Sequence, residues 1–160
     1  IDKAIDAKST IDVAENIANK ITSDFFPWFY QNNVTDKSST IHSENYYFTH
    51  LFYDNNEQSS FFNYVIPILK KIKYKKLIRV KANLYPNVNK LIQHSKHIDY
   101  NYPTKGALYY LNTNNGPTYV ENKKIDSVKN RLLLFNAFKK HNSTTCTDKK
   151  FRVNININYL

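Results

Sequence analysis

The spacing of hydrophobic residues predicts two helices in the first half of the chain. Residues 10–22 carry a helical stripe, and Ser9 and Asp12 near its start are candidate capping residues. Its apolar positions are Ile11, Ala14, Ala18 and Ile21. Residues 61–73 predict a second helix, in which Pro67 marks a kink or a restart. An aromatic block over residues 25–30 is expected to pack the first helix onto a sheet.

The second half of the chain alternates with a period of two, which is typical of strands that are buried on one face. Residues 77–85 and 152–159 show the cleanest alternation. In the latter, Asn154, Asn156 and Asn158 share a face with Arg152. Further strands are expected at residues 46–53, 107–112, 119–121 and 131–136. Loops are expected at residues 32–45, 54–60 and 138–150, and a turn at residues 113–117.

This order of elements predicts a mainly β fold with flanking helices, in the α+β class. Helices come first and short strands with turns follow, as in an antiparallel sandwich or jelly roll with helices packed on one side. A length of 160 residues indicates a single domain over residues 1–160.

The composition is that of a folded, aromatic-rich protein, with 41% hydrophobic and 15% aromatic residues. No apolar run is long enough to cross a membrane, and no signal peptide is evident. The single Cys146 excludes an internal disulfide, is interpreted as a loop residue without function, and favours a cytoplasmic location. The sequence contains no methionine, even at position 1, which indicates a trimmed chain or a fragment.

The net charge of +10 allows a nucleic-acid partner. However, the basic residues lie in short groups, and the abundance of Lys, Asn, Ile and Tyr with only two glycines suggests compositional bias. Nucleic acid is therefore a disfavoured partner.

The chemical signal lies at His97 and Asp99. An imidazole and a carboxylate two residues apart on an extended segment point to the same side. A later histidine, His141, can complete a set of two histidines and one carboxylate, the ligand pattern of non-haem Fe(II) oxygenases. A zinc site using His94 and His97 is the alternative, but one cysteine provides no thiolate cluster. The other histidines, His42, His50 and His94, are expected in surface loops.

Several short motifs occur in a fixed order between residues 77 and 158. They are Tyr85-Pro86, His97-x-Asp99, Tyr109-Tyr110-Leu111-Asn112, Arg131-Leu132 with Phe135, His141 and Arg152. This order resembles the prolyl-hydroxylase-like branch of the Fe(II)/2-oxoglutarate-dependent dioxygenases. The resemblance implies a double-stranded β-helix of the jelly-roll, cupin-like type, with a catalytic core at residues 77–160. Residues 1–76 match only as a helical and aromatic support region.

The resemblance also implies the roles of individual residues. His97, Asp99 and His141 would be catalytic ligands of Fe(II), and Arg152 would bind the far carboxylate of 2-oxoglutarate. A buried carboxylate requires such a cationic, bidentate partner. Tyr110 would bind the same carboxylate, and Tyr85 would lie beside the metal-bound end.

Three further expectations concern the co-substrate pocket. Asn154 stands two positions after the arginine, where the family frequently has Ser or Thr, so its contact would differ. The resemblance implies that Tyr110 faces the barrel interior, and strand parity then places Leu108 inside with it and Tyr109 outside. The nucleic-acid-demethylating branch carries a second arginine where this chain has Asn158, which disfavours that substrate.

The expected function is therefore Fe(II)- and 2-oxoglutarate-dependent oxygenation, an oxidoreductase reaction that hydroxylates a substrate C–H bond and releases succinate and CO2. Its partners would be dioxygen, a peptide or small-molecule substrate, and ascorbate as a reductant, without a membrane. The alternative is a non-catalytic binding protein on the same scaffold, whose basic surface holds nucleic acid or another acidic partner.

Overall fold

Two antiparallel sheets form the framework of the protein. The computed structural model describes residues 3–6, 12–34 and 45–160. The larger sheet consists, in spatial order, of β1 (Lys3–Asp6), β9 (Arg131–Asn136), β6 (Lys105–Tyr110), β11 (Phe151–Tyr159), β5 (Leu77–Pro86), β3 (Tyr47–Asp54) and β2 (Phe29–Gln31), with β4 (Glu57–Gln58) paired to β3. The smaller sheet consists of β10 (His141–Asn142), β7 (Asn114–Val120) and β8 (Lys123–Ser127). The expected mainly β jelly roll is confirmed.

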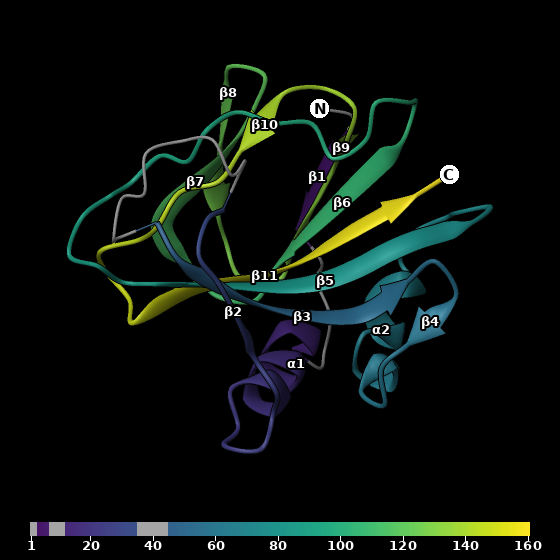
Figure 1. Ribbon diagram of the computed structural model, residues 1–160, viewed down its shortest axis with the longest axis horizontal. Coiled ribbons are helices and arrows are strands. Elements are labelled where there is room, and N and C mark those ends of the chain that lie inside the picture. The colour runs from purple at the N-terminus through teal and green to yellow at the C-terminus, as the bar shows by residue number, and fades with distance from the viewer. Residues whose placement is uncertain (1–2, 7–11, 35–44) are drawn as a thin grey trace.

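Strand β11 lies at the centre of the larger sheet and pairs with both β5 and β6. Its alternating residues therefore face two different environments. Val153, Ile155 and Ile157 are at most 1% exposed and join the main hydrophobic core on the side of the helices. The intervening asparagines face the smaller sheet, which lies on the opposite side in Figure 1. The smaller sheet therefore covers the polar face of the larger sheet.

The first helix, α1 (Val13–Ile21), matches its predicted position. Asp12 is the N-cap, and its carboxylate accepts a hydrogen bond of 3.0 Å from the Glu15 backbone N–H. Ala14, Ile17 and Ile21 pack into the core beneath the sheet. The other expected cap, Ser9, lies outside the described residues, as does most of the loop predicted at residues 32–45.

The second helix is much shorter than the prediction of residues 61–73, which is wrong in this respect. A 3-10 turn at Phe62–Tyr64 precedes α2, which covers only Ile66–Leu69. Pro67 occupies the first turn, where its missing N–H is tolerated, so the helix restarts there. Five lysines follow within residues 70–76, and like charges three or four positions apart oppose further helix.

The smaller sheet contains the largest departures from the sequence predictions. The sequence predicts a turn at residues 113–117, but Asn114–Val120 is strand β7. A register irregularity between Asn114 and Thr118 accommodates Pro117, which has no N–H to donate. The sequence also predicts a loop around His141, whereas this residue belongs to the two-residue strand β10, which pairs with β7.

The N-terminal part of the chain contributes more than helical and aromatic support. It supplies strands β1 to β4, and β3 lies directly beside β5. Phe26 of the aromatic block is buried in the core as expected. Phe25, in the turn after α1, is 94% exposed, and Phe29, on the edge strand β2, is 59% exposed.

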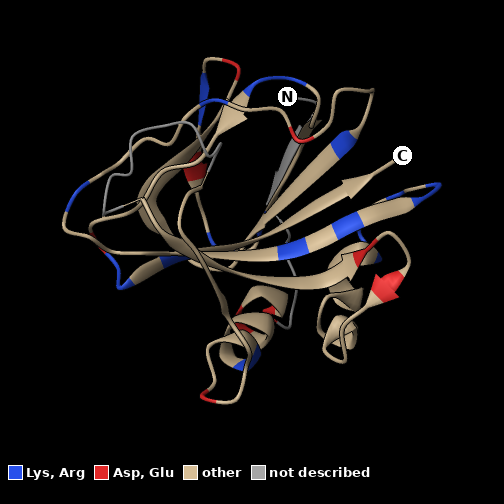
Figure 2. Cartoon of the chain, in the orientation of Figure 1, with Lys and Arg blue, Asp and Glu red and all other residues tan. Residues whose placement is uncertain are grey.

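The basic residues are spread over several strands and loops instead of forming one continuous stripe (Figure 2). Among the described residues, no helix is both long and apolar enough to span a membrane.

We expect Ile155→Ala to destabilise the fold severely. Ile155 is fully buried between the sheet and the helices, and truncation of such a side chain costs about 2–5 kcal/mol. Denaturant unfolding would measure the change in the free energy of unfolding. Leu91→Ala is the matched control, because Leu91 is 50% exposed and should change stability by about 0.5 kcal/mol or less.

Candidate metal centre and adjoining anion pocket

The site is built on the polar face of strands β5 and β11. Their antiparallel register sets Arg79 opposite Asn158, Lys81 opposite Asn156, Asn83 opposite Asn154, and Tyr85 opposite Arg152. Because side chains alternate along both strands, all eight point toward the smaller sheet. This face therefore runs from one cation, Arg79, to another, Arg152.

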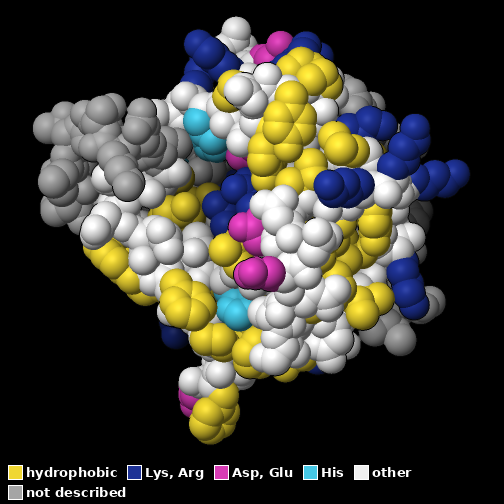
Figure 3. All heavy atoms as spheres, turned by 45° about the vertical axis from the view of Figure 1, so that its right-hand side comes forward, with side chains coloured by type: hydrophobic (Ala, Val, Ile, Leu, Met, Phe, Trp, Pro, Cys, Tyr) yellow, Lys and Arg dark blue, Asp and Glu magenta, His cyan; other side chains and the backbone are white. Residues whose placement is uncertain are grey.

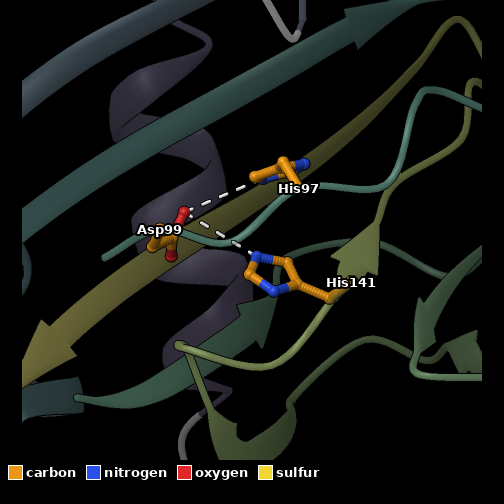
Figure 4. Close-up of side chains that lie close together, drawn as sticks. All are labelled: His97, Asp99 and His141. Atoms are coloured by element: carbon orange, nitrogen blue, oxygen red, sulfur yellow. Dashed lines mark ion pairs between the residues drawn. The ribbon is translucent and has the colours of Figure 1, made fainter. Parts of the chain in front are cut away.

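Three side chains from two segments meet above this face (Figure 4). His97 and His141 form an isolated antiparallel bridge, in which each backbone N–H donates to the other residue's carbonyl at 2.9 Å. The Asp99 backbone N–H donates to the Ala137 carbonyl at 3.0 Å, which continues this alignment. The local backbone pairing thus brings His141 beside the His97 and Asp99 pair, as the spacing in the sequence predicted.

The geometry of the three side chains fits a single metal ion. The Nε2 atoms of His97 and His141 both lie 3.7 Å from Oδ1 of Asp99. One ligand atom from each residue lies within 4.8 Å of the others. Two ligands on one ion at bond lengths of about 2.1 Å are separated by about 3.0–4.2 Å, so the pairs to Asp99 have a suitable spacing.

The electrostatic environment favours the metal-binding forms of His97 and Asp99. Burial lowers the pKa of His97, and the neighbouring His141 lowers it further, which favours the neutral imidazole. Burial alone would raise the pKa of the Asp99 carboxyl, but interactions with His141, Arg79 and Asn158 outweigh it and hold that pKa below its usual range. Neutral imidazole and ionised carboxylate are the forms that bind a metal.

Arg152 lies at the other end of the same cavity and is fully buried. Its Nη2 donates to the Thr118 hydroxyl at 2.7 Å, and its Nε donates to the Gly116 carbonyl at 3.0 Å and to the Ser127 hydroxyl at 3.2 Å. All of these acceptors are neutral. No acidic side chain among the described residues lies within ion-pair distance of the guanidinium. A buried charge of this kind calls for an anionic ligand.

The surroundings of Arg152 include the two tyrosines predicted for the pocket. The Arg152 guanidinium lies 5.3 Å from the Tyr85 ring centre and 6.0 Å from that of Tyr110. The Tyr110 hydroxyl donates to Thr118 at 2.8 Å, so Tyr110 and Arg152 share one acceptor. Burial raises the pKa of Tyr110, which keeps its hydroxyl protonated as a donor.

The parity prediction for the two adjacent tyrosines is confirmed. Tyr110 and Leu108 pack on the inner side with Val120 and Phe135, whereas Tyr109 joins the core on the side of the helices. The Tyr109 hydroxyl donates to the Asn130 side chain. Tyr110 and Leu108 therefore lie on the side of the sheet that faces the cavity.

The cavity connects the metal triad with Arg152. It is lined by Asn83, Tyr85, His97, Leu108, Thr118, Phe135, His141, Asn142, Ser143, Arg152, Asn154 and Asn156. Figure 3 shows a face on which histidine, acidic and basic side chains adjoin between hydrophobic patches.

Two of the predicted site residues lie behind this lining. The Asp99 carboxylate is turned toward Asn158 and the histidines. Tyr110 is fully buried behind Thr118, to which its hydroxyl is bonded. Both therefore lie at the edge of the cavity.

Several polar atoms that line this cavity have no hydrogen-bond partner in the protein. Within the described part of the chain, the side-chain oxygens of Asn83 and Asn156 and both side-chain polar atoms of Asn142 are buried without a hydrogen-bond partner. Buried polar atoms in native proteins are almost always paired, so these positions are expected to meet a ligand or water. Asn154 is paired, since it accepts a hydrogen bond of 3.1 Å from Asn83.

Two histidine predictions are wrong. The sequence predicts His50 and His94 in surface loops, but both are only 4% exposed, and His42 lies outside the described residues. His50 is enclosed by the aromatic block and bonded to the Pro27 carbonyl and the Ser59 hydroxyl. His94 stacks on Tyr85 beside the cavity. The predicted strand at residues 46–53 contains His50 and was an available signal of its burial, whereas the burial of His94 depends on distant segments.

Sequence reasoning also missed several residues that complete the site. Thr118 and Ser127 come from the smaller sheet, whose strands were predicted incompletely, and Arg79 contacts Asp99 from β5. Asn158 donates to Asp99, a contact that the sequence did not predict. The available signal was the alternation of residues 152–159, which placed Asn158 on the same face as Arg152.

Comparisons with solved structures support the fold. A prolyl hydroxylase from Trichoplax adhaerens, in complex with a peptide fragment of the hypoxia inducible factor oxygen degradation domain, matches with a TM-score of 0.64 at 16% identity. The match covers 99% of this chain and 82% of that one. A 2OG-Fe(II) oxygenase family oxidoreductase from Burkholderia pseudomallei matches with a TM-score of 0.56 at 11% identity, covering 83% of this chain and 72% of that one.

A Pseudomonas putida prolyl-4-hydroxylase matches with a TM-score of 0.51 at 10% identity, covering 92% of this chain and 98% of that one. No family model and no curated protein sequence matches the chain. The resemblance to prolyl-hydroxylase-like 2-oxoglutarate oxygenases is confirmed at the level of the fold.

The burial of His94 predicts a specific acid sensitivity. Burial, together with the charge of Arg152, lowers the pKa of His94 to about 3. In the unfolded chain, the pKa of a histidine is about 6.5. Between these values the unfolded state holds more protons, so stability contributed by neutral His94 is lost as the pH falls below about 6.5. Urea unfolding of wild type and His94→Gln at pH 7.5 and 5 should show a smaller loss in the variant. Equal losses would contradict the assignment.

Proposed function

We propose that this protein is an Fe(II)- and 2-oxoglutarate-dependent dioxygenase that hydroxylates a C–H bond of an organic substrate. The observation that carries the proposal is the combination, around one cavity, of a two-histidine, one-carboxylate triad and a buried arginine that has no acidic partner among the described residues. A zinc site would explain the triad, but it would not explain this cation. The shared fold with 2-oxoglutarate oxygenases raises the weight of this assignment without establishing catalysis.

The donor set suits Fe(II). His97, His141 and Asp99 would hold the ion by two neutral nitrogens and one carboxylate oxygen, leaving other positions open for ligands. Bound Fe(II) would supply the oxidation chemistry, which couples the use of dioxygen and the decarboxylation of 2-oxoglutarate to succinate with oxygen insertion into a C–H bond. The protein contributes the placement of the ligands and a largely buried setting for them.

The residues near Arg152 would bind the far carboxylate of 2-oxoglutarate. The Arg152 guanidinium offers N–H donors to that carboxylate and would compensate its charge. Thr118 and Tyr110 already form a hydrogen-bonded group with this arginine, so their hydroxyls are positioned before any ligand arrives. Leu108 would pack against the carbon chain, and Tyr85 and Asn154 would line the path toward the metal.

The substrate is proposed by analogy. The Trichoplax neighbour is described with a bound peptide fragment, and a peptide substrate is accordingly the leading candidate for this chain. A small molecule is the other candidate, since nothing among the described residues indicates which amino acid of a peptide substrate would be hydroxylated.

Iron-dependent formation of succinate from labelled 2-oxoglutarate tests the proposal, with ascorbate supplied as reductant. We expect turnover by wild type even without a prime substrate, because this family reaction can run uncoupled. His97→Ala, Asp99→Ala and His141→Ala should each abolish it, since each removes one of the three candidate ligands that the described residues provide. Lys123→Ala, on an exposed position of β8, is the control and should retain wild-type turnover.

Wild-type turnover in all three ligand variants would exclude the triad. Absence of succinate formation by the wild-type protein, with iron and 2-oxoglutarate bound, would instead favour the alternative, a non-catalytic binding protein on this scaffold. Such a protein would use its basic surface for nucleic acid or another acidic partner.

The two adjacent tyrosines provide a matched pair for the co-substrate pocket. Tyr110→Phe removes a hydroxyl that lies close to Thr118 and Arg152 and that would donate to the far carboxylate of 2-oxoglutarate. Loss of a hydrogen bond to such a charged group costs about 1.5–3 kcal/mol. We therefore expect about a 10- to 100-fold weaker binding of 2-oxoglutarate. Tyr109→Phe, on the opposite face, should change it little. Titration of 2-oxoglutarate into the metal-loaded variants measures both, and equal effects would remove Tyr110 from the pocket.

A further inference from the structure

The two oxygens of the Asp99 carboxylate have different surroundings. Oδ1 faces both histidines, with each Nε2 at 3.7 Å. Oδ2 points away from them and accepts a hydrogen bond of 2.8 Å from Nδ2 of Asn158 and a longer one of 3.4 Å from Nδ2 of Asn156. The carboxylate is therefore oriented before any metal is bound, and one oxygen is presented to the metal position.

The orientation of Asn158 is itself fixed by a second contact. Its side-chain oxygen accepts a hydrogen bond of 3.2 Å from Nε of Arg79, so its amide nitrogen must face Asp99. Asn158 is fully buried and stands opposite Arg79 in the β5–β11 ladder. The Arg79 guanidinium also lies 3.4 Å from Oδ1 of Asp99 and 5.6 Å from the Tyr100 ring centre. Neither partner can turn easily without breaking a neighbouring contact.

We infer that Asn158 is a positioning residue for the metal centre: it holds Oδ2 of Asp99 so that Oδ1 alone faces the metal together with His97 and His141. This inference rests on the proposed function only in taking the triad to be a metal site. Asn158 would not touch the ion or the substrate, and it would act entirely through the orientation of Asp99.

The chemistry of the amide explains why asparagine suits this position. An amide offers a donor to Asp99 and an acceptor to Arg79 from the same side chain, without adding charge. An aspartate here would keep the shape, but it would place a second negative oxygen against Oδ2. A leucine would fill the space and provide no donor, so the carboxylate could rotate and offer both oxygens to the ion. Partners of metal ligands commonly alter metal affinity by about 10- to 100-fold when they are removed.

Binding of Co(II), without 2-oxoglutarate or turnover, tests the inference. Co(II) serves as the probe because its visible absorption reports the ligand geometry. We expect Asn158→Leu and Asn158→Asp to bind Co(II) about 10- to 100-fold more weakly than wild type and to give altered absorption bands.

Asn114→Leu is the matched control for these variants. Asn114 is also a buried strand asparagine whose amide both donates and accepts hydrogen bonds, to Asn112 and from the Gly116 backbone N–H. It contacts neither Asp99 nor the histidines and does not line the cavity. The variant should retain the wild-type affinity and spectrum.

The outcomes separate this inference from the proposed function. Wild-type affinity and spectrum in both Asn158 variants would overturn the positioning role, while loss of binding in His97→Ala would still support the metal site. Equal losses in the Asn114 and Asn158 variants would assign Asn158 a merely structural role and would also overturn the inference. If wild type fails to bind Co(II), the metal site itself falls, and the inference with it. Since Asn158→Asp preserves the volume of the side chain, a change in that variant cannot be attributed to a cavity.

Discussion

The site depends on the antiparallel ladder between β5 and β11. Its register fixes which residues lie opposite one another, and a shift by one residue would send every polar side chain into the hydrophobic core. Burial of Val80, Ile155 and Ile157 on the opposite face specifies that register strongly. The hydrophobic effect on one side of the sheet therefore places Arg152 and the asparagines on the other side.

Placing charges on an enclosed face is energetically costly, and the structure offsets that cost unevenly. Asp99 is surrounded by donors, among them Arg79 and Asn158, and this compensation holds its carboxyl pKa low. Arg152 has only neutral acceptors among the described residues. The charge of Asp99 is thus compensated by protein groups, whereas the charge of Arg152 is not compensated by an acidic side chain among the described residues, and this difference is why we propose an anionic ligand beside Arg152.

The same enclosure sets the protonation of the histidines. Desolvation lowers the pKa of His94 and His97, because water no longer stabilises the imidazolium form. A neutral His97 beside an ionised Asp99 is the form that binds a metal, so the candidate site and the fold have a common physical origin. The smaller sheet also supplies residues of the site, since β10 carries His141 and β7 carries Thr118, which accepts a hydrogen bond from Arg152.

The sequence by itself determined the mainly β class and the grouping of His97, Asp99 and His141, because these follow from local spacing and the alternation of side chains along a strand. Alternation also separated Tyr109 from Tyr110, and the resemblance to the dioxygenase family indicated which of them faces inward. Only the tertiary structure decided the burial of His94, the pairing of β10, and the contact of Asn158 with Asp99, which are 59 residues apart in the chain. These features depend on which strands become neighbours and in which register, and that choice results from the packing of the whole core. A single strand's pattern shows that one of its faces is polar, but the partner of each polar group is set by the segment that folds over it.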